Sequence, residues 1–124
     1  MGWNDFSLPV RGGAYCNEDG SCRQSEIARC LPGDLIRVER EPDNPHDHMA
    51  VALVSERGVR LGYLSRTHAG WIGSKIDRDY DVRAIVERVR QTGCLAAPLA
   101  LVVRLNLDGD EPELPEPTSA RVVG

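Results

Sequence analysis

The residues best suited to chemistry lie in one short stretch, 40–51, which reads Arg-Glu-Pro-Asp-Asn-Pro-His-Asp-His-Met-Ala-Val. Its carboxylates, amide and two imidazoles offer a varied set of hydrogen-bonding groups. Pro42 and Pro45 fix their own φ angles and push the residues before them toward extended geometry. The stretch therefore predicts a stiff polar loop that runs into an apolar strand, where a binding group can be held in fixed geometry.

Metal binding and catalysis are alternatives for the same residue types. His46 and His48 could share one side of an extended backbone and, with cysteines, could in principle complete a zinc site. The cysteines stand at 16, 22, 30 and 94, however, and zinc sites want closer pairs of the form C-x2-4-C. No Ser/His/Asp spacing, phosphate-binding G-x4-G-K-[ST] loop or H-E-x-x-H motif is present. We therefore expect no catalytic residue, no bound metal and no cofactor.

The elements that must position this loop are short strands. Alternation and β-branched residues predict strands at 7–16 (interrupted at Gly12-Gly13), 34–40, 49–54, 59–64, 80–90 and 97–107. The segment 80–90 also fits one face of a helix, and the choice of a strand rests on its β-branched residues and the turn at 91–93. The interior strand at 49–54 is apolar on both sides and should be buried.

Two short helices are expected between the strands. Ser21 and Gln24 have the spacing of a capping box, and Ile27, Cys30 and Leu31 would form the apolar face of the helix that follows. A second helix is predicted at 68–78, with Thr67 as its N-cap. The fold class is therefore mainly β with two short helices, arranged as a small six-stranded antiparallel barrel of OB-like or SH3-like type.

Charge and composition divide the 124-residue chain into an N-terminal lead at 1–6, a barrel at 7–107 and an acidic tail at 108–124. The tail holds five carboxylates, one arginine and three prolines, and we expect it to be disordered. Residues 1–107 hold 14 basic and 14 acidic residues, so the barrel is neutral. A neutral barrel does not suit a protein that grips long duplex DNA, but it allows a small site that reads one end or a few nucleotides.

Neither a membrane span nor a secretory signal is expected. No apolar run approaches the ~20 residues that a transmembrane helix needs. Residues 1–6 also lack the basic and apolar regions of a signal peptide. We therefore expect a cytoplasmic protein, whose cysteines are reduced thiols and partly fill the core.

The stretch 40–51, together with Gly-Tyr-Leu-Ser-Arg at 62–66, resembles the central signature of HIRAN domains. A weaker match at 10–15 extends the resemblance over roughly 10–107. HIRAN domains are small β-barrels related to the OB and SH3-like folds. They occur alone in bacteria and phages and attached to helicase-like DNA repair ATPases in eukaryotes. The resemblance also supports a strand at 80–90 and the helix that follows Ser21.

In characterised members of that family, the module captures the 3′ end of single-stranded DNA. The terminal bases stack on aromatic residues, and an aspartate of the signature loop hydrogen-bonds the 3′-hydroxyl. The resemblance then implies a set of DNA-binding residues: Asp47 as that aspartate, Asn44 near the terminal nucleotide, Tyr15 as a stacking aromatic, Tyr63 where the family has a phosphate-facing histidine, and Arg66 where it has a lysine.

The chain departs from the family pattern at two positions. Cys16 replaces a second aromatic residue, and Ala14 replaces a basic one. Because base–aromatic stacking is worth ~1–3 kcal/mol per base, the affinity could be roughly ten- to hundredfold lower. His46 or Tyr63 could supply a substitute surface.

Each of these residues also has a structural alternative. Asp47 could accept backbone N–H groups in an Asx-turn, and Asn44 before Pro45 is a common turn residue. Tyr15 could be a half-buried barrel residue. Arg40 is expected to pair with loop carboxylates, and Trp71 to pack against the barrel.

The leading functional interpretation is a non-enzymatic module that recognises single-stranded DNA, at its 3′-hydroxyl end, in repair, replication or recombination. A helicase, a nuclease or another repair protein would be its partner. The alternative is a non-catalytic adaptor that docks a protein through the barrel or the acidic tail. A third interpretation is a part of a zinc-dependent or ATP-hydrolysing machine whose catalytic residues come from another chain.

Overall fold

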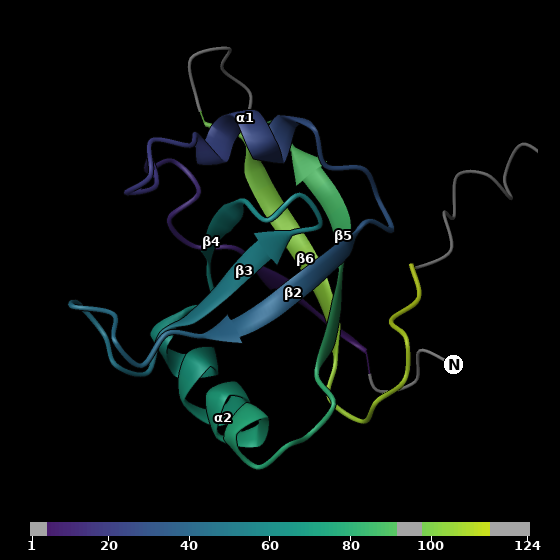
Figure 1. Ribbon diagram of the computed structural model, residues 1–124. Coiled ribbons are helices and arrows are strands. Elements are labelled where there is room, and N and C mark those ends of the chain that lie inside the picture. Colours follow the sequence, from purple (N-terminus) through teal and green to yellow (C-terminus); the bar gives the residue numbers. More distant parts are fainter. Residues whose placement is uncertain (1–4, 92–97, 115–124) are drawn as a thin grey trace, which may run out of the picture.

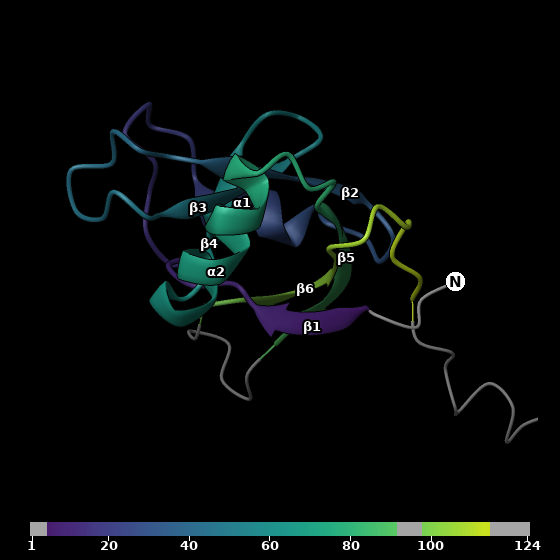
Figure 2. The same ribbon diagram turned by 90° about the horizontal axis from the view of Figure 1, so that it is seen from below.

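The computed structural model describes residues 5–91 and 98–114. These contain β1 (Phe6–Pro9), α1 (Arg23–Ala28), β2 (Leu35–Arg40), β3 (Val51–Ser55), β4 (Arg60–Tyr63), α2 (Arg66–Asp77), β5 (Arg83–Arg90) and β6 (Ala100–Asn106). The strands form one antiparallel sheet in the order β1-β6-β5-β2-β3-β4. The sheet curls on itself, and α1 and α2 lie at opposite ends of it (Figures 1 and 2). The expected mainly β class, with a small antiparallel barrel, is confirmed.

The segment after β1 pairs with β4, so it brings the two edge strands of the sheet, β1 and β4, close together. Arg11 and Tyr63 exchange two backbone hydrogen bonds, of 2.7 and 2.8 Å. Gly62 makes this approach possible, because a Cβ atom there would lie 2.4 Å from the carbonyl oxygen of Arg11. The strand expected at 7–16 is therefore broken in two. Gly12 turns the chain with a φ of +75°, and Cys16 pairs again, with Cys22.

The strand predictions from periodicity hold in the interior of the sheet. All five residues of β3 are buried, as expected for a strand that is apolar on both faces, but the strand begins at Val51, and Met49, which the prediction included, is 45% exposed. The segment 80–90 contains β5, so the choice of a strand over a helix was correct. The core is made by side chains from the strands and both helices, with Ile27, Leu53, Leu61, Ile72, Leu101 and Leu105 among the fully buried ones.

The start of α1 differs from the predicted capping box. The N-cap is Cys22, whose sulfur accepts from the amide of Ser25 at 3.5 Å. Ser21 instead donates its hydroxyl to Asp19 at 2.6 Å in the preceding turn. The side chain of Gln24 contacts the backbone of Gly13 and Leu99 rather than the helix. Competing partners nearby in space have thus displaced both members of the box.

Two further local predictions were wrong. Leu31 is 66% exposed, because the helix has ended by residue 29 and the chain is already turning away from the core. The N-cap of α2 is Ser65 rather than Thr67, and its hydroxyl oxygen accepts from the amide of His68. The helix accordingly begins at Arg66.

Arg40 has a structural role, but its partner is not in the loop. It forms an ion pair with Asp77 of α2, with 3.5 Å between NH1 and Oδ2. Its guanidinium lies against Gly73, where a Cβ atom would come within 2.5 Å of NH1. Trp71 packs as expected and stacks on Phe6, with 5.8 Å between ring centroids.

The beginning of the predicted acidic tail is hydrogen-bonded to the barrel and to the residue before β1. Asn106 accepts from the amides of Asp108 and Asp110 at 2.8 and 3.2 Å, and Asp5 accepts from the amide of Glu113 at 2.8 Å. The rest of the tail, 115–124, lies outside the described residues, as do most of the lead, the turn at 92–93 and Cys94. Neither described helix is long and apolar enough to cross a membrane.

Candidate nucleic-acid interface

The loop between β2 and β3 is held by hydrogen bonds of its own residues. The side-chain oxygen of Asn44 accepts from the amides of His46 and Asp47, at 2.9 and 3.1 Å. One carboxylate oxygen of Asp47, Oδ1, accepts from the amide of Met49 at 2.9 Å. The loop is closed at its base by a bond from the amide of Glu41 to the carbonyl of Ala50. The expected polar loop is present, and Asx-type turns form at Asn44 and at Asp47 within it.

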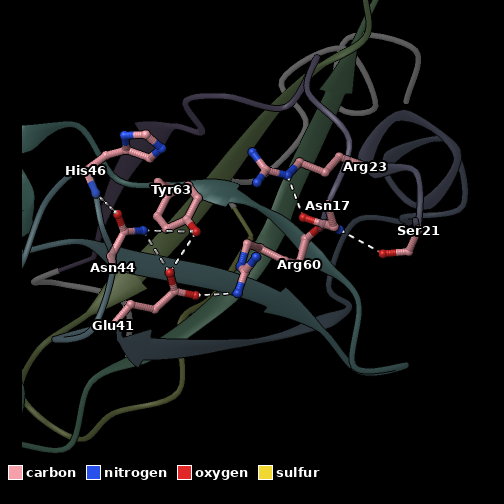
Figure 3. A network of polar contacts seen from close by, with 8 residues as sticks. All are labelled: Asn17, Ser21, Arg23, Glu41, Asn44, His46, Arg60 and Tyr63. Atoms are coloured by element: carbon pink, nitrogen blue, oxygen red, sulfur yellow. Dashed lines mark hydrogen bonds and ion pairs between the residues drawn. The ribbon is translucent and has the colours of Figure 1, made fainter. Parts of the chain in front are cut away.

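At the base of the loop, Glu41 is the centre of a polar network (Figure 3). Its Oε1 accepts from the Tyr63 hydroxyl at 2.7 Å and from the Asn44 amide at 3.1 Å, and its Oε2 pairs with Arg60 at 2.7 Å. Burial raises the pKa of Glu41, but the bonds from Tyr63 and Asn44 and the charge of Arg60 outweigh it, so the pKa lies below its ordinary value. Glu41 is therefore ionised at neutral pH.

Tyr63 is fixed both at its hydroxyl and across its ring. The guanidinium carbons of Arg23 and Arg60 lie 5.4 and 5.7 Å from the ring centroid, within the range of cation–π contacts. Burial and the bond to the charged Glu41 raise the pKa of Tyr63. The hydroxyl therefore stays protonated and remains committed to Glu41. Glu41, Asn44, Arg60 and Tyr63 are called the inner wall below.

Arg23 is itself anchored by the segment that follows β1. Its Nε donates to Asn17 at 2.7 Å, and its NH1 donates to the carbonyl of Gly12 at 2.8 Å. Asn17 in turn donates to Ser21 and to the carbonyl of Arg60. Segment 10–22 and the loop 41–50 project on the same side of the barrel in both views (Figures 1 and 2).

Between these two segments lies a cavity of about 730 Å³. It is lined by all six residues expected from the sequence: Tyr15, Asn44, His46, Asp47, Tyr63 and Arg66. His48 is not among the lining residues, and its ring bonds the carbonyl of Pro42 at 3.1 Å. One loop, one turn, strand β4 and the first residue of α2 thus bring together side chains that are up to 51 positions apart in the sequence.

Four of the expected residues form the outer rim of the cavity: Tyr15, His46, Asp47 and Arg66. The Tyr15 residue is 71% exposed, and the Arg66 side chain is 84% exposed. The second carboxylate oxygen of Asp47, Oδ2, lies 3.9 Å from Nε of Arg66, and the Asp47 side chain is 26% exposed. Tyr15, His46 and Arg66 are therefore accessible to a ligand, whereas Asp47 is partly buried, as are Arg60 and Glu41 of the inner wall, whose side chains are 32% and 20% exposed.

Sequence reasoning missed three arginines that line the cavity: Arg11, Arg23 and Arg60. With Arg66 they make four cations against three carboxylates, Glu18 and Asp47 in the lining and Glu41 behind it, so the cavity carries a small positive excess although the barrel is neutral. Arg23 belongs to the stretch 19–24, Asp-Gly-Ser-Cys-Arg-Gln, which leads into α1 as it does in the HIRAN family, and this was the available signal. No signal marked Arg60, whose side chain meets Glu41 only in the folded sheet.

The described residues provide no grouping for a metal. Across 5–91 and 98–114, no three His, Cys, Asp or Glu side chains come together in a way that could hold an ion. The zinc alternative raised by His46, His48 and the cysteines therefore has no support from this part of the chain.

A small curled antiparallel barrel with an arginine-lined cavity defines a class of compact binding domains. The HIRAN domain family model matches residues 5–108, and the chain belongs to that family. The family is one of binding domains, known for nucleic-acid binding.

Two solved structures are similar in fold. One is a protein from Lactobacillus plantarum, with 19% identity, a TM-score of 0.58, and coverage of 82% of this chain and 97% of that one. The other is the HIRAN domain of human HLTF, with 17% identity, a TM-score of 0.58, and coverage of 82% and 73%. No curated protein matches the chain.

Proposed function

We propose that this protein binds the 3′-hydroxyl end of single-stranded DNA in the cavity, as a non-enzymatic cytoplasmic module serving repair, replication or recombination. The observation that carries the proposal is the meeting of an accessible carboxylate, an exposed aromatic ring and several arginines in one cavity. The volume falls within the ~300–1,000 Å³ range of small-ligand sites, which suits a chain end rather than a duplex.

Asp47 has the geometry to read the end of the strand. Its Oδ1 is occupied by the amide of Met49, whereas its Oδ2 has the exposed Arg66 at 3.9 Å. A carboxylate is an acceptor only, so Oδ2 can accept a hydrogen bond from a 3′-hydroxyl. The same carboxylate would repel a 3′-phosphate, whose charge is close to −2 at neutral pH.

Arginines of the cavity would hold the phosphates. Arg66 and Arg11 are exposed and can reach a phosphate of the incoming strand. Arg23 is anchored inside the protein and contributes fixed positive charge to the cavity, whereas the charge of Arg60 is largely balanced by Glu41. Arg11, Arg23 and Arg66 would thus offset the loss of the basic residue that Ala14 replaces.

Tyr15 would stack on a terminal base, and His46 offers a second exposed ring beside the loop. Asn44 and Tyr63 have a different role in this proposal. The Asn44 amide already makes four contacts within the protein, and the Tyr63 hydroxyl is bonded to Glu41. We therefore assign both as positioning residues that hold Asp47 and the loop in place.

The test compares short single-stranded oligonucleotides that end in a 3′-hydroxyl or a 3′-phosphate. A charge-assisted hydrogen bond contributes ~1.5–3 kcal/mol, so wild type should prefer the hydroxyl by about tenfold or more in fluorescence anisotropy. Asp47→Ala should lose that preference, whereas Arg66→Ala should weaken both ligands about equally and lower the slope of affinity against salt.

Asp43→Ala is the matched control, because Asp43 is an exposed carboxylate of the same loop that does not line the cavity. It should keep the preference for the hydroxyl. If wild type binds both ends alike, or Asp47→Ala retains the preference, the end-reading proposal fails. A complete absence of salt-dependent DNA binding would favour the adaptor interpretation instead.

A further inference from the structure

Cys16 and Cys22 face each other across a narrow hairpin at the edge of the cavity. They are paired in antiparallel register, and both are exposed. The amide of Asn17 donates to the carbonyl of Ser21 at 3.0 Å, so the next pair along, Cys16 and Cys22, is of the non-hydrogen-bonded kind. In such a pair the Cα atoms are about 4.5 Å apart and the side chains project to the same face. This separation lies within the range of about 4.4–6.8 Å that disulfides span.

The hairpin is held in this geometry by its own side chains. Asp19 accepts from both the amide and the hydroxyl of Ser21, at 2.9 and 2.6 Å, and Asn17 donates to the same hydroxyl at 3.0 Å. The two cysteines therefore do not need a rearrangement of the backbone to meet.

We propose that Cys16 and Cys22 form a reversible disulfide under peroxide, and that this bond weakens ligand binding in the adjacent cavity. The Cys22 thiolate would attack one oxygen of hydrogen peroxide, which forms a sulfenic acid and releases hydroxide. The Cys16 thiolate would then attack the sulfur of Cys22, so that the S–S bond forms, the S–O bond breaks and a second hydroxide leaves. Together with the protons of the two thiols, the hydroxides give two molecules of water.

The Cys22 thiol loses its proton more readily than an ordinary cysteine, which suits it to the first attack. Hydrogen bonding to Ser25 holds the pKa of Cys22 below its ordinary value. Burial, in contrast, raises the pKa of Cys30 to about 11. Cys30 therefore serves as an internal reference for a thiol that should not react.

The disulfide would act on the cavity through the neighbours of the two cysteines. Tyr15 precedes Cys16, Arg23 follows Cys22, and both line the cavity. The Cys22 sulfur now accepts from the amide of Ser25, and if it turns from there toward Cys16, α1 loses its N-cap. Arg23 is the first residue of that helix, so its hold on Gly12 and Asn17 would loosen. This consequence for DNA rests on the proposed function, whereas formation of the bond does not.

The first arm of the test is chemical. Both cysteines lie in a single tryptic peptide, 12–23, which is separate from the peptides that contain Cys30 and Cys94. After treatment with hydrogen peroxide and alkylation, mass spectrometry should find 12–23 unalkylated and lighter by two hydrogens, and dithiothreitol should reverse the change. A peptide that stays fully alkylated, or that is found linked to Cys94 or to another chain, overturns the proposal. Cys94→Ser should leave the result unchanged.

The second arm measures binding of a 3′-hydroxyl oligonucleotide by reduced and oxidised protein. Oxidised wild type should bind at least about threefold more weakly than reduced wild type, because the helix turn that holds Arg23 has lost its N-cap. Cys22→Ser keeps a good N-cap and cannot form the bond, so its affinity should not respond to peroxide. Unchanged affinity in oxidised wild type would overturn the regulatory role. Failure of reduced wild type to bind would instead reject the proposed function, while the chemical arm would still decide whether the disulfide forms.

Discussion

The inner wall and the outer rim of the cavity are built from neighbouring residues, yet their side chains are used differently. In the inner wall, Glu41 binds Tyr63, Asn44 and Arg60 at once, and these contacts are partly buried. In the rim, Tyr15 and Arg66 are mostly exposed. The difference indicates two roles. Side chains whose polar groups are hydrogen-bonded within the protein position the site, whereas exposed side chains can contact a ligand.

Among substitutions in the inner wall, we expect Glu41→Ala to lower the free energy of unfolding most. The change leaves the Tyr63 hydroxyl and Arg60 without their acceptor, which should cost about 1–3 kcal/mol of unfolding free energy in urea titrations. Glu39→Ala is the matched control two residues away, on β2, because Glu39 forms an exposed pair with Arg37 and should cost less than about 0.5 kcal/mol. Equal losses in the two variants would show that the network is not a support.

This contribution should also depend on pH in a defined direction. The folded-state pKa of Glu41 is lowered, so its ionised form stabilises the fold above the unfolded-state pKa. The stabilisation is lost as the pH falls through the folded-state pKa. The stability difference between wild type and Glu41→Ala should thus be constant near neutral pH and narrow in acid.

The rim should show the opposite behaviour in Tyr15→Ala. Removing one stacking ring should weaken binding of single-stranded DNA by ~1–3 kcal/mol, measured by anisotropy, while stability stays nearly unchanged because Tyr15 is 71% exposed. Tyr80→Ala is the control. Tyr80 is an exposed tyrosine whose ring contacts Lys75 and Arg78 outside the cavity, so its substitution should leave DNA binding unaltered. A loss of stability without a loss of affinity would show that Tyr15 supports the fold and does not bind DNA.

A smaller effect is expected for Tyr63→Phe, which sharpens the boundary between the two regions. The variant loses one hydrogen bond to Glu41, so stability should fall by about 1 kcal/mol. Affinity for a 3′-hydroxyl oligonucleotide should change by less than about threefold, because the hydroxyl is already used inside the protein. A large, uniform loss of affinity would instead place Tyr63 in direct contact with a phosphate.

The sequence was informative where a signal is local. Alternation and β-branched residues identified the strands, and the spacing of Pro42, Asn44 and Pro45 identified a stiff loop whose turns do form. The resemblance to HIRAN domains marked five residues, and the search for a substitute aromatic surface added His46; all six line one cavity.

Features that depend on distant partners could not be predicted in this way. Glu41 and Arg60 meet only because β2, β3 and β4 pair in register, and Arg23 reaches Tyr63 across the opening of the barrel. The caps failed for a related reason. Ser21 is drawn to Asp19, and so Cys22, a residue rarely considered as an N-cap, takes its place.

The most direct test of the central claim asks whether the protein needs a DNA end at all. A linear single-stranded oligonucleotide and a covalently closed circle of the same sequence should be compared in anisotropy competition at one salt concentration. Both have the same bases and phosphates per nucleotide, but only the linear form can present a 3′-hydroxyl to Asp47. We expect the linear form to compete about tenfold better or more, as a charge-assisted hydrogen bond at the end would require. Equal competition by the circle would contradict end recognition.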